Sequence, residues 1–180
     1  MNISLSKLSA IIAYFAQNTS PHYLGKTKLM KLFYYLDFLH TKKFGISVTK
    51  DRYVRLEKGP IPSTIMNLIT ELSLDPESSP LAKNILIEKP EGMRIHRIKS
   101  LKKFTKDDED LFTKSELNVL ADVVKRFGDE DTETVVEASH KEAPWLETKY
   151  GETIPYELAA HDPDSLYSEE EIRLLQEINK

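Results

Sequence analysis

The 180-residue sequence contains no cysteine. This absence excludes a disulfide framework and any chemistry that uses a thiolate. The sequence also has no apolar run long enough to span a membrane, because lysine or aspartate interrupts each candidate. Its first residues, MNISLSKLSAIIAYF, do not show the basic start and the small-residue cleavage site of a signal peptide. We therefore expect a cytoplasmic protein without membrane contact.

Charge is distributed unevenly along the chain, whose net charge is −4. Residues 1–60 hold ten basic and three acidic residues, a net charge of +7, whereas residues 61–180 carry −11. This asymmetry predicts either an exposed basic face or two regions that pack together, so that their opposite charges largely cancel. The acidic run KDDED, residues 106–110, is expected to be solvated. The overall acidity argues against a dedicated nucleic-acid-binding protein.

Hydrophobic periodicity and capping residues predict about six helices. A broad apolar stripe indicates the strongest one, at about residues 27–43, and Gly45 follows it as a C-terminal stop. Capping boxes that start at Thr113 and Ser168 begin two other helices. The expected helices cover residues 4–18, 27–43, 63–72, 114–127, 132–141 and 168 to the end of the chain. Either Ser4 or Ser6 is expected to cap the first of them.

Two segments predict a small antiparallel sheet. RYVRLE, residues 52–57, alternates as a strand does, and the region of residues 84–99 has two alternating arms around Pro-Glu-Gly, as in a hairpin. KGPIP, residues 58–62, is interpreted as a stiff turn from strand to helix, because Gly59 permits an unusual backbone shape and the prolines restrict it further. No long linker divides the chain. The sequence therefore predicts one mostly helical α+β domain over residues 1–180.

Two separated motifs stand in a characteristic order. The first is the helix KLMKLFYYLDFLH, followed by a glycine, a strand and the segment GPIPS. The second is LNVLADVVKRFGDEDTETVVEASHKEAPW, in which a helix ending at glycine precedes a second helix and S-H-x-E-x-P-W. In this order the motifs resemble the Panacea domain of the SocA-like antitoxin family. The resemblance covers about residues 5–150 and leaves residues 151–180 as a C-terminal extension with a terminal helix.

This resemblance implies an antitoxin of a bacterial or prophage toxin–antitoxin system. Members of the family are similar in neutralising a toxin, commonly encoded by the adjacent gene, through direct protein contact. One branch looks like a proteolytic adaptor, which would make a protease a second partner. The residues alone leave a further alternative, a regulator whose basic surface binds nucleotides or nucleic acid. The oligomeric state stays open.

Basic and aromatic residues around the glycine-proline segment form the predicted partner-binding surface. Arginine and aromatic side chains beside a rigid turn suit a protein partner, because docking costs little side-chain freedom. Of the two adjacent tyrosines, one is expected in the core and one at the surface. A purely structural role is the competing interpretation. The predicted surface comprises Lys28, Lys31, Tyr34, Tyr35, Arg55, Lys58, Gly59, Pro60 and Pro62.

Two pairs of titratable residues suggest either a metal site or acid–base catalysis, although a structural role is favoured for both pairs. Asp37 and His40 are three residues apart on one helix, a spacing that suits two metal ligands. His40 falls on the apolar side, however, where a hydrogen-bonded core histidine is expected. His140 and Glu142 could form an acid–base pair, but no nucleophile motif accompanies them. We therefore expect no enzyme activity, no cofactor and no metal site, with His140 closing a helix and Trp145 packing on the core.

Overall fold

The computed structural model of the protein describes residues 3–89 and 96–179. Within these ranges the fold is α+β, as predicted, with small antiparallel sheets and nine helical segments. The helices are α1 (Leu5–Asn18), α2 (Lys26–Phe44), α3 (Ser63–Leu74), α4 (Lys106–Glu109), α5 (Lys114–Phe127), α6 (Thr132–Ser139), α7 (Ala143–Leu146), the 3-10 helix η1 (Tyr156–His161) and α8 (Glu169–Ile178). The strands are β1 (Tyr53–Leu56), β2 (Gly59–Pro62), β3 (Ile85–Glu88), β4 (Arg97–Ser100) and β5 (Thr153–Ile154).

The predicted number of about six helices is too low, because α4, α7 and η1 are too short to carry a helical period. Local capping makes these segments helical. In α4, Thr105 and Asp108 form a capping box, and Asp108 also accepts a hydrogen bond from Lys102 Nζ at 2.5 Å. The run KDDED is therefore not uniformly solvated, since Asp108 is buried.

Capping residues predicted the ends of the long helices correctly. The capping boxes that begin at Thr113 and Ser168 both form, and the Ser4 side chain accepts a hydrogen bond from the first turn of α1. Gly45 ends α2 in the left-handed region, with φ of 74°. Each of these signals depends only on residues close in sequence, which is why the sequence reveals them.

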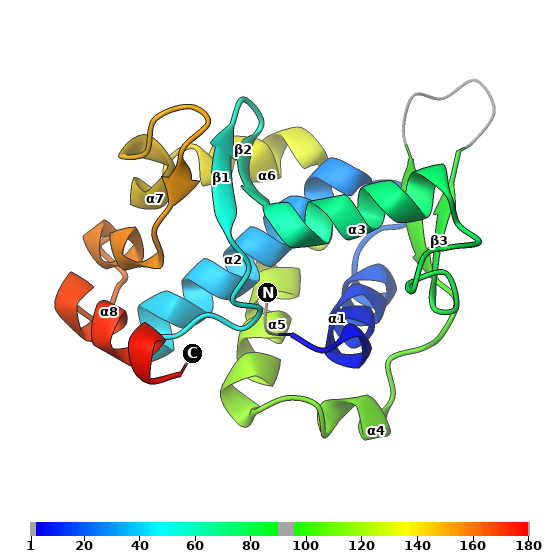
Figure 1. Cartoon of the computed structure of the whole chain (residues 1–180), viewed down its shortest axis with the longest axis horizontal. Helices are drawn as coiled ribbons and strands as arrows, with labels where there is room; N and C mark the ends of the chain where they lie inside the picture. Colours follow the sequence, from blue (N-terminus) through cyan, green and yellow to red (C-terminus); the bar gives the residue numbers. More distant parts are fainter. Residues whose placement is uncertain (1–2, 90–95, 180) are drawn as a thin grey trace.

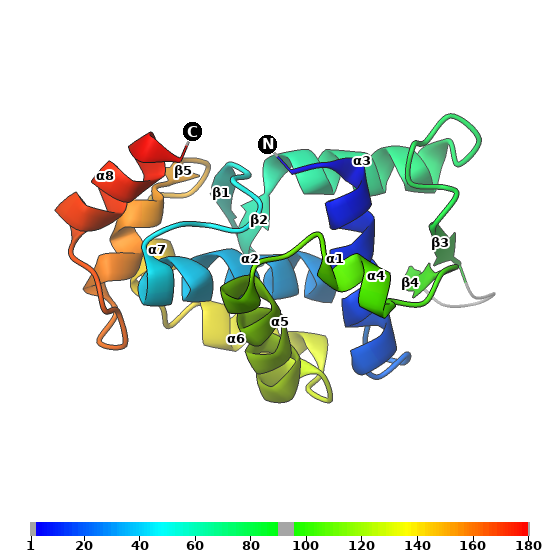
Figure 2. The same cartoon turned by 90° about the horizontal axis from the view of Figure 1, so that it is seen from below.

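Helix α2 passes through the middle of the molecule (Figure 1). Fourteen of its 19 residues are buried, so it is covered on all sides rather than along one apolar stripe. Helices α5 and α6 lie on one side of α2, and α3 with the β1–β2 hairpin lies on the other (Figure 2). Neither α2 nor another helix in the described ranges is long and apolar enough to cross a membrane.

The segment GPIP is a strand, which corrects its interpretation as a turn. Strand β1 lies in the middle of a three-stranded antiparallel sheet with the order β2-β1-β5. Arg55 of β1 is opposite Pro60, and Leu56 is opposite Gly59, so the hairpin turns at residues 57–58. Proline cannot donate to a ladder, but it is tolerated on an edge strand such as β2. The two prolines concealed the strand because they are rare in strands.

The predicted hairpin in residues 84–99 is confirmed by β3 and β4. These strands pair antiparallel, with Ile85 opposite Ser100 and Ile87 opposite Ile98. The Pro-Glu-Gly tip and the beginning of the expected second arm, up to residue 95, lie outside the described residues. The hairpin lies next to α1, on the far side of the molecule from α8 (Figure 1).

Candidate functional site

The predicted surface divides into residues of α2 and residues of the β1–β2 hairpin. The side chains of Lys28, Lys31 and Tyr34 have no exposed surface, and Tyr35 is only 2% exposed. The structure thus places these four residues in the core instead of on an exposed basic face. The expectation that one of the two tyrosines lies at the surface is wrong. Lysines are mostly exposed in proteins. The sequence does not show which distant backbone oxygens will accept hydrogen bonds from a buried lysine.

Lys28 is held by carbonyl oxygens at the end of α5. Its Nζ donates hydrogen bonds to the oxygens of Gly128 at 2.9 Å and Glu130 at 2.5 Å. The C-terminal end of a helix favours a cation, because its carbonyl dipoles point there. Burial lowers the pKa of Lys28, and the carboxylates of Asp129, Glu130 and Asp131 oppose that shift. Lys28 therefore joins the α5–α6 turn to α2.

Lys31 lies directly beneath β2, against Gly59. Its Nζ donates a hydrogen bond to the carbonyl oxygen of Pro60 at 2.5 Å. Gly59 has a φ of 90°, and a Cβ atom there would lie 2.9 Å from Lys31 Cε and 2.6 Å from Ser139 Oγ. Glycine is thus favoured at position 59 both by the backbone conformation and by close packing. Because burial removes hydration from the ammonium group, the pKa of Lys31 falls to about 7.

The pKa of Lys31 predicts a pH-dependent stability. Between about pH 7 and its ordinary value of 10.5, the unfolded chain holds one more proton at this residue than the folded chain. The free energy of unfolding should therefore rise with pH in this window, by up to about 1.4 kcal/mol per pH unit from Lys31 alone. Urea denaturation at pH 7, 8 and 9 should show this slope in the wild type and a smaller one in Lys31→Met. Equal slopes would mean that Lys31 titrates near its ordinary value.

Three side chains of the hairpin and of the α6–α7 region stack together. The guanidinium carbon of Arg55 lies 4.0 Å from the centre of a Trp145 ring, and the His140 ring stacks on Trp145 with centroids 4.1 Å apart. These three residues are half-buried, and Lys31 packs against Gly59 of β2, the strand that pairs with β1. We call the set of Lys31, Arg55, Gly59, His140 and Trp145 the Arg55 cluster. It combines residues from α2, from the hairpin and from the segment around α7.

Trp145 was expected on the core, and its position beside Arg55 was missed. The tryptophan is only half-buried, and it reaches β1, where its Nε1 lies 3.5 Å from the Leu56 carbonyl oxygen. The backbone also joins these segments, because the amide of Gly151 donates to the Arg55 carbonyl oxygen at 2.8 Å. No local pattern in the sequence indicates these contacts. His140, as predicted, closes α6 as its C-cap residue.

Two nitrogen atoms of the Arg55 cluster are buried without a hydrogen-bond partner among the described residues. They are Nε of Arg55 and Nε2 of His140. Burial, followed by the positive charges of Lys31 and Arg55, lowers the pKa of His140, and Glu137 opposes this. The cluster is therefore an electropositive site with unused hydrogen-bonding capacity.

The other hairpin residues of the predicted surface differ in accessibility. Lys58 is exposed at the turn, whereas Gly59, Pro60 and Pro62 are buried in β2. Of the nine predicted residues, only Arg55 and Lys58 thus present side chains to solvent.

Glu142 belongs to a buried network rather than to an acid–base pair with His140. Its carboxylate accepts a hydrogen bond from Tyr34 at 3.1 Å and lies 3.3 Å from Lys42 Nζ. Lys42 also contacts Asp162 at 2.9 Å and Asp164 at 3.1 Å. Burial raises the pKa of Glu142, and the nearby Lys42 opposes the shift. We call this set of Tyr34, Lys42, Glu142, Asp162 and Asp164 the Lys42 network.

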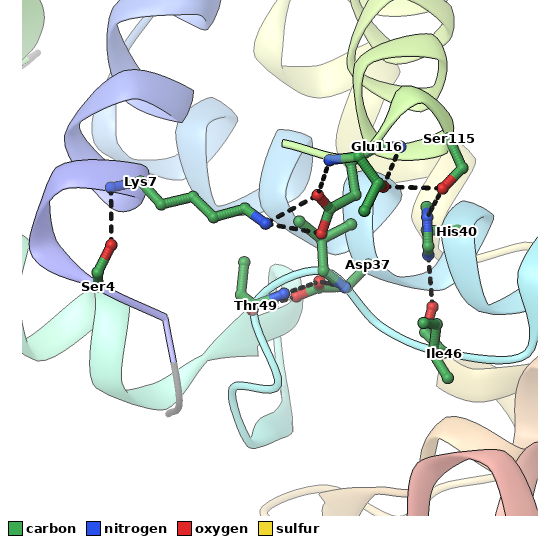
Figure 3. Close-up of polar contacts among 10 residues, drawn as sticks. Ser4, Lys7, Asp37, His40, Ile46, Thr49, Ser115 and Glu116 are labelled. Atoms are coloured by element: carbon green, nitrogen blue, oxygen red, sulfur yellow. Dashed lines mark hydrogen bonds and ion pairs between the residues drawn. The ribbon is translucent and has the colours of Figure 1, made fainter. Parts of the chain in front are cut away.

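Asp37 and His40 bind separate groups of the protein (Figure 3). The Asp37 carboxylate accepts hydrogen bonds from the amides of Val48 and Thr49, from the Thr49 hydroxyl and from the Tyr53 hydroxyl, at 2.5–2.8 Å. Its complete burial raises the pKa of Asp37 to about 6, although all four donors oppose the shift. His40 is the hydrogen-bonded core histidine that was predicted.

The two ring nitrogens of His40 contact different elements. Nδ1 lies 2.7 Å from the carbonyl oxygen of Ile46, and Nε2 lies 3.1 Å from the Ser115 hydroxyl (Figure 3). Since a carbonyl only accepts, Nδ1 carries the proton and, in the neutral ring, Nε2 accepts from Ser115. Within the described residues, no group of three or more acidic or histidine side chains is arranged to hold a metal ion.

Basic residues near the start of the chain pair with acidic residues that follow much later. Both carboxylate oxygens of Glu116 accept from Lys7 Nζ, at 2.7 and 2.8 Å (Figure 3), and Lys43 pairs with Asp122. Together with the Lys42 network, these contacts favour the second interpretation of the uneven charge distribution. The two oppositely charged regions pack together and partly cancel.

Comparison with known proteins identifies the family. The family model Antitoxin SocA-like, Panacea domain, matches residues 29–146, or 118 of the 180 residues. No curated protein and no solved structure gives a significant match. The matched range begins in α2 and ends in α7, so it contains every residue of the Arg55 cluster. The chain therefore belongs to the family of SocA-like antitoxins with a Panacea domain.

Proposed function

We propose that the protein is an antitoxin that neutralises a protein toxin by direct contact, with the Arg55 cluster in the contact surface. Membership of an antitoxin family supports the general role. The observation that carries the choice of surface is the half-buried stack of Arg55 on Trp145. Arginine and tryptophan are among the residues that contribute most to protein interfaces. The proposal contains no catalytic step and no cofactor.

Exposed apolar side chains in the same two segments extend this surface. Leu56 in the hairpin is 36% exposed, Leu146 is 58% exposed and Tyr150 is 71% exposed. Isolated exposed apolar residues are normal on soluble proteins. Here they accompany an arginine–tryptophan stack on a backbone that the sheet holds in place. A prepared surface of this kind loses little side-chain freedom when a partner binds.

The toxin is expected to be the product of the adjacent gene. The test is to express that gene in a bacterial host alone and together with this protein, and then to isolate the tagged pair. Restored growth with recovery of a stable complex is the expected result. Restored growth with loss of the toxin protein would instead indicate delivery to a protease. A harmless neighbour and no complex would contradict the proposal.

A charge reversal at Arg55 is expected to abolish neutralisation. Arg55→Glu places a carboxylate in the contact surface, where like or unpaired charge costs several kcal/mol of binding. Arg52→Glu is the matched control, because Arg52 is an exposed arginine that immediately precedes β1. Side chains alternate between the two faces along a strand, and Arg52 is three residues from Arg55, so its side chain points to the opposite face. Growth rescue and complex yield should be lost in the first variant and kept in the second. Full rescue by a folded Arg55→Glu protein would exclude this surface.

A further inference from the structure

The Arg55 cluster contains nitrogen atoms that have no hydrogen-bond partner among the described residues. Leaving a buried polar group without a partner costs about 1–3 kcal/mol, so native proteins rarely retain one without a reason. Two such atoms, Arg55 Nε and His140 Nε2, occur in residues stacked on the same tryptophan. Arg55 Nε always carries a proton and only donates. The partner that Arg55 Nε lacks is therefore a hydrogen-bond acceptor.

The charges around the cluster favour an anion. Lys31 and Arg55 both act on the imidazole of His140, and Glu137 is the acidic residue that opposes them. The contact with the Trp145 ring restricts the movement of the Arg55 guanidinium. A guanidinium held in this way presents parallel N–H donors, which match the two oxygens of a carboxylate.

A carboxylate fits the surroundings better than a nucleic-acid phosphate does. Binding of nucleic acid requires an extended basic patch that follows the backbone. Here the chain is acidic overall, and most of its early lysines are buried or paired. The site contains one tryptophan, and Leu56, Leu146 and Tyr150 in the same two segments are exposed. These are features of a site for a single side chain of another protein.

We propose that the Arg55 cluster is a carboxylate-binding site that receives an aspartate or glutamate side chain of the partner protein. This assignment rests on the proposed function for the identity of the partner. The carboxylate accepts from the Arg55 guanidinium, and the neutral His140 ring provides a second donor in the tautomer that carries the proton on Nε2. In its protonated form, Lys31 adds positive charge from beneath β2.

The single tryptophan of the chain allows a direct test, because Trp145 belongs to the cluster. We would titrate the purified full-length protein with the peptide acetyl-Gly-Glu-Gly-amide and follow tryptophan fluorescence at constant ionic strength. Parallel titrations would use the glutamine peptide, inorganic phosphate and a short single-stranded oligonucleotide. The glutamate peptide should give a saturable change below about 0.1 M, the affinity expected for one charge-assisted pair. The glutamine peptide should give none.

Variants connect the signal to the site. Arg55→Gln should weaken binding of the glutamate peptide about tenfold or more, and Arg52→Gln should leave it unchanged. If Arg55→Gln does not fold, as judged by circular dichroism, His140→Gln takes its place and should also weaken binding. No saturable response to the glutamate peptide, or an equal response from the glutamine peptide, would overturn the assignment. So would tighter binding of phosphate or of the oligonucleotide.

The titration and the growth test fail independently. The titration uses no toxin, so peptide binding by a protein that does not rescue growth would keep the carboxylate site and reject the antitoxin role. Rescue without peptide binding would keep the antitoxin role and reject the carboxylate site.

Discussion

Replacing Asp37 by alanine is expected to lower the free energy of unfolding by about 4 kcal/mol. Four donors converge on this buried carboxylate, and two of them are backbone amides that cannot turn away. Each buried donor left without an acceptor costs about 1–3 kcal/mol. The loss would be a large part of the 5–15 kcal/mol that stabilises a typical domain. Asp37 also joins the loop after α2 to Tyr53 of β1, so the damage should extend to the sheet.

Urea denaturation of two further variants would isolate this effect. Asp37→Asn keeps one acceptor oxygen and the volume of the side chain, so its loss should be smaller than that of Asp37→Ala. Asp122→Ala removes a carboxylate that is half-exposed and paired with Lys43. Exposed ion pairs contribute about 0–1 kcal/mol, so this control should change little. A loss below about 1 kcal/mol in Asp37→Ala would show that water replaces the carboxylate easily.

The second large effect is expected at Lys42. Its ammonium group is the cation of the Lys42 network, and its side chain is only 4% exposed. Lys42→Met would leave the buried carboxylates of Glu142 and Asp162 without this charge. Removing one partner of a buried ion pair typically costs about 3–5 kcal/mol. Lys42 opposes the burial that raises the pKa of Glu142, so without Lys42 this carboxyl group would hold a proton more readily and the loss should shrink as the pH is lowered.

The next residue in the sequence supplies the control for Lys42. Lys43 pairs with Asp122, and 37% of the Lys43 side chain and 47% of the Asp122 side chain are exposed. Lys43→Met should therefore change the unfolding free energy by less than about 1 kcal/mol. Thermal and urea unfolding of the two methionine variants would compare the loss of stability on removing a buried lysine charge with the loss on removing an exposed one. Equal effects would contradict the structural role assigned to the Lys42 network.

Local features of the fold could be predicted from the sequence, whereas features that depend on distant residues could not. The Thr113 capping box and Gly45 act on their own helices, so the pattern was sufficient to predict the helix ends. GPIP was misinterpreted because its prolines oppose strand formation, and only pairing with β1 makes it a strand. The short helix α7 has no period to detect.

In the candidate site, too, the sequence predicted what depends on nearby residues and failed where the contacts come from distant ones. Arg55 was identified because arginine next to a glycine-proline segment suggests binding, and the structure leaves it accessible. Lys28 and Lys31 were assigned to the same surface because lysine is usually exposed. Their acceptors are the carbonyl oxygens of Gly128 and Pro60, which stand 100 and 29 residues further along the chain. The sequence shows the charge of a lysine, but it does not show which oxygens will accept hydrogen bonds from its ammonium group.

The position of β5 has a consequence for the order in which the protein is made. Strand β1 gains its second neighbour only when Tyr53 pairs with Ile154, and Lys42 reaches its full set of carboxylates only with Asp164. A nascent chain that has left the ribosome only as far as residue 146 has the whole matched family region, yet its sheet is incomplete. Domains fold as units during synthesis. We therefore expect the complete β2-β1-β5 sheet to form only after residue 154 has left the ribosome, so a chain interrupted at residue 146 would lack it.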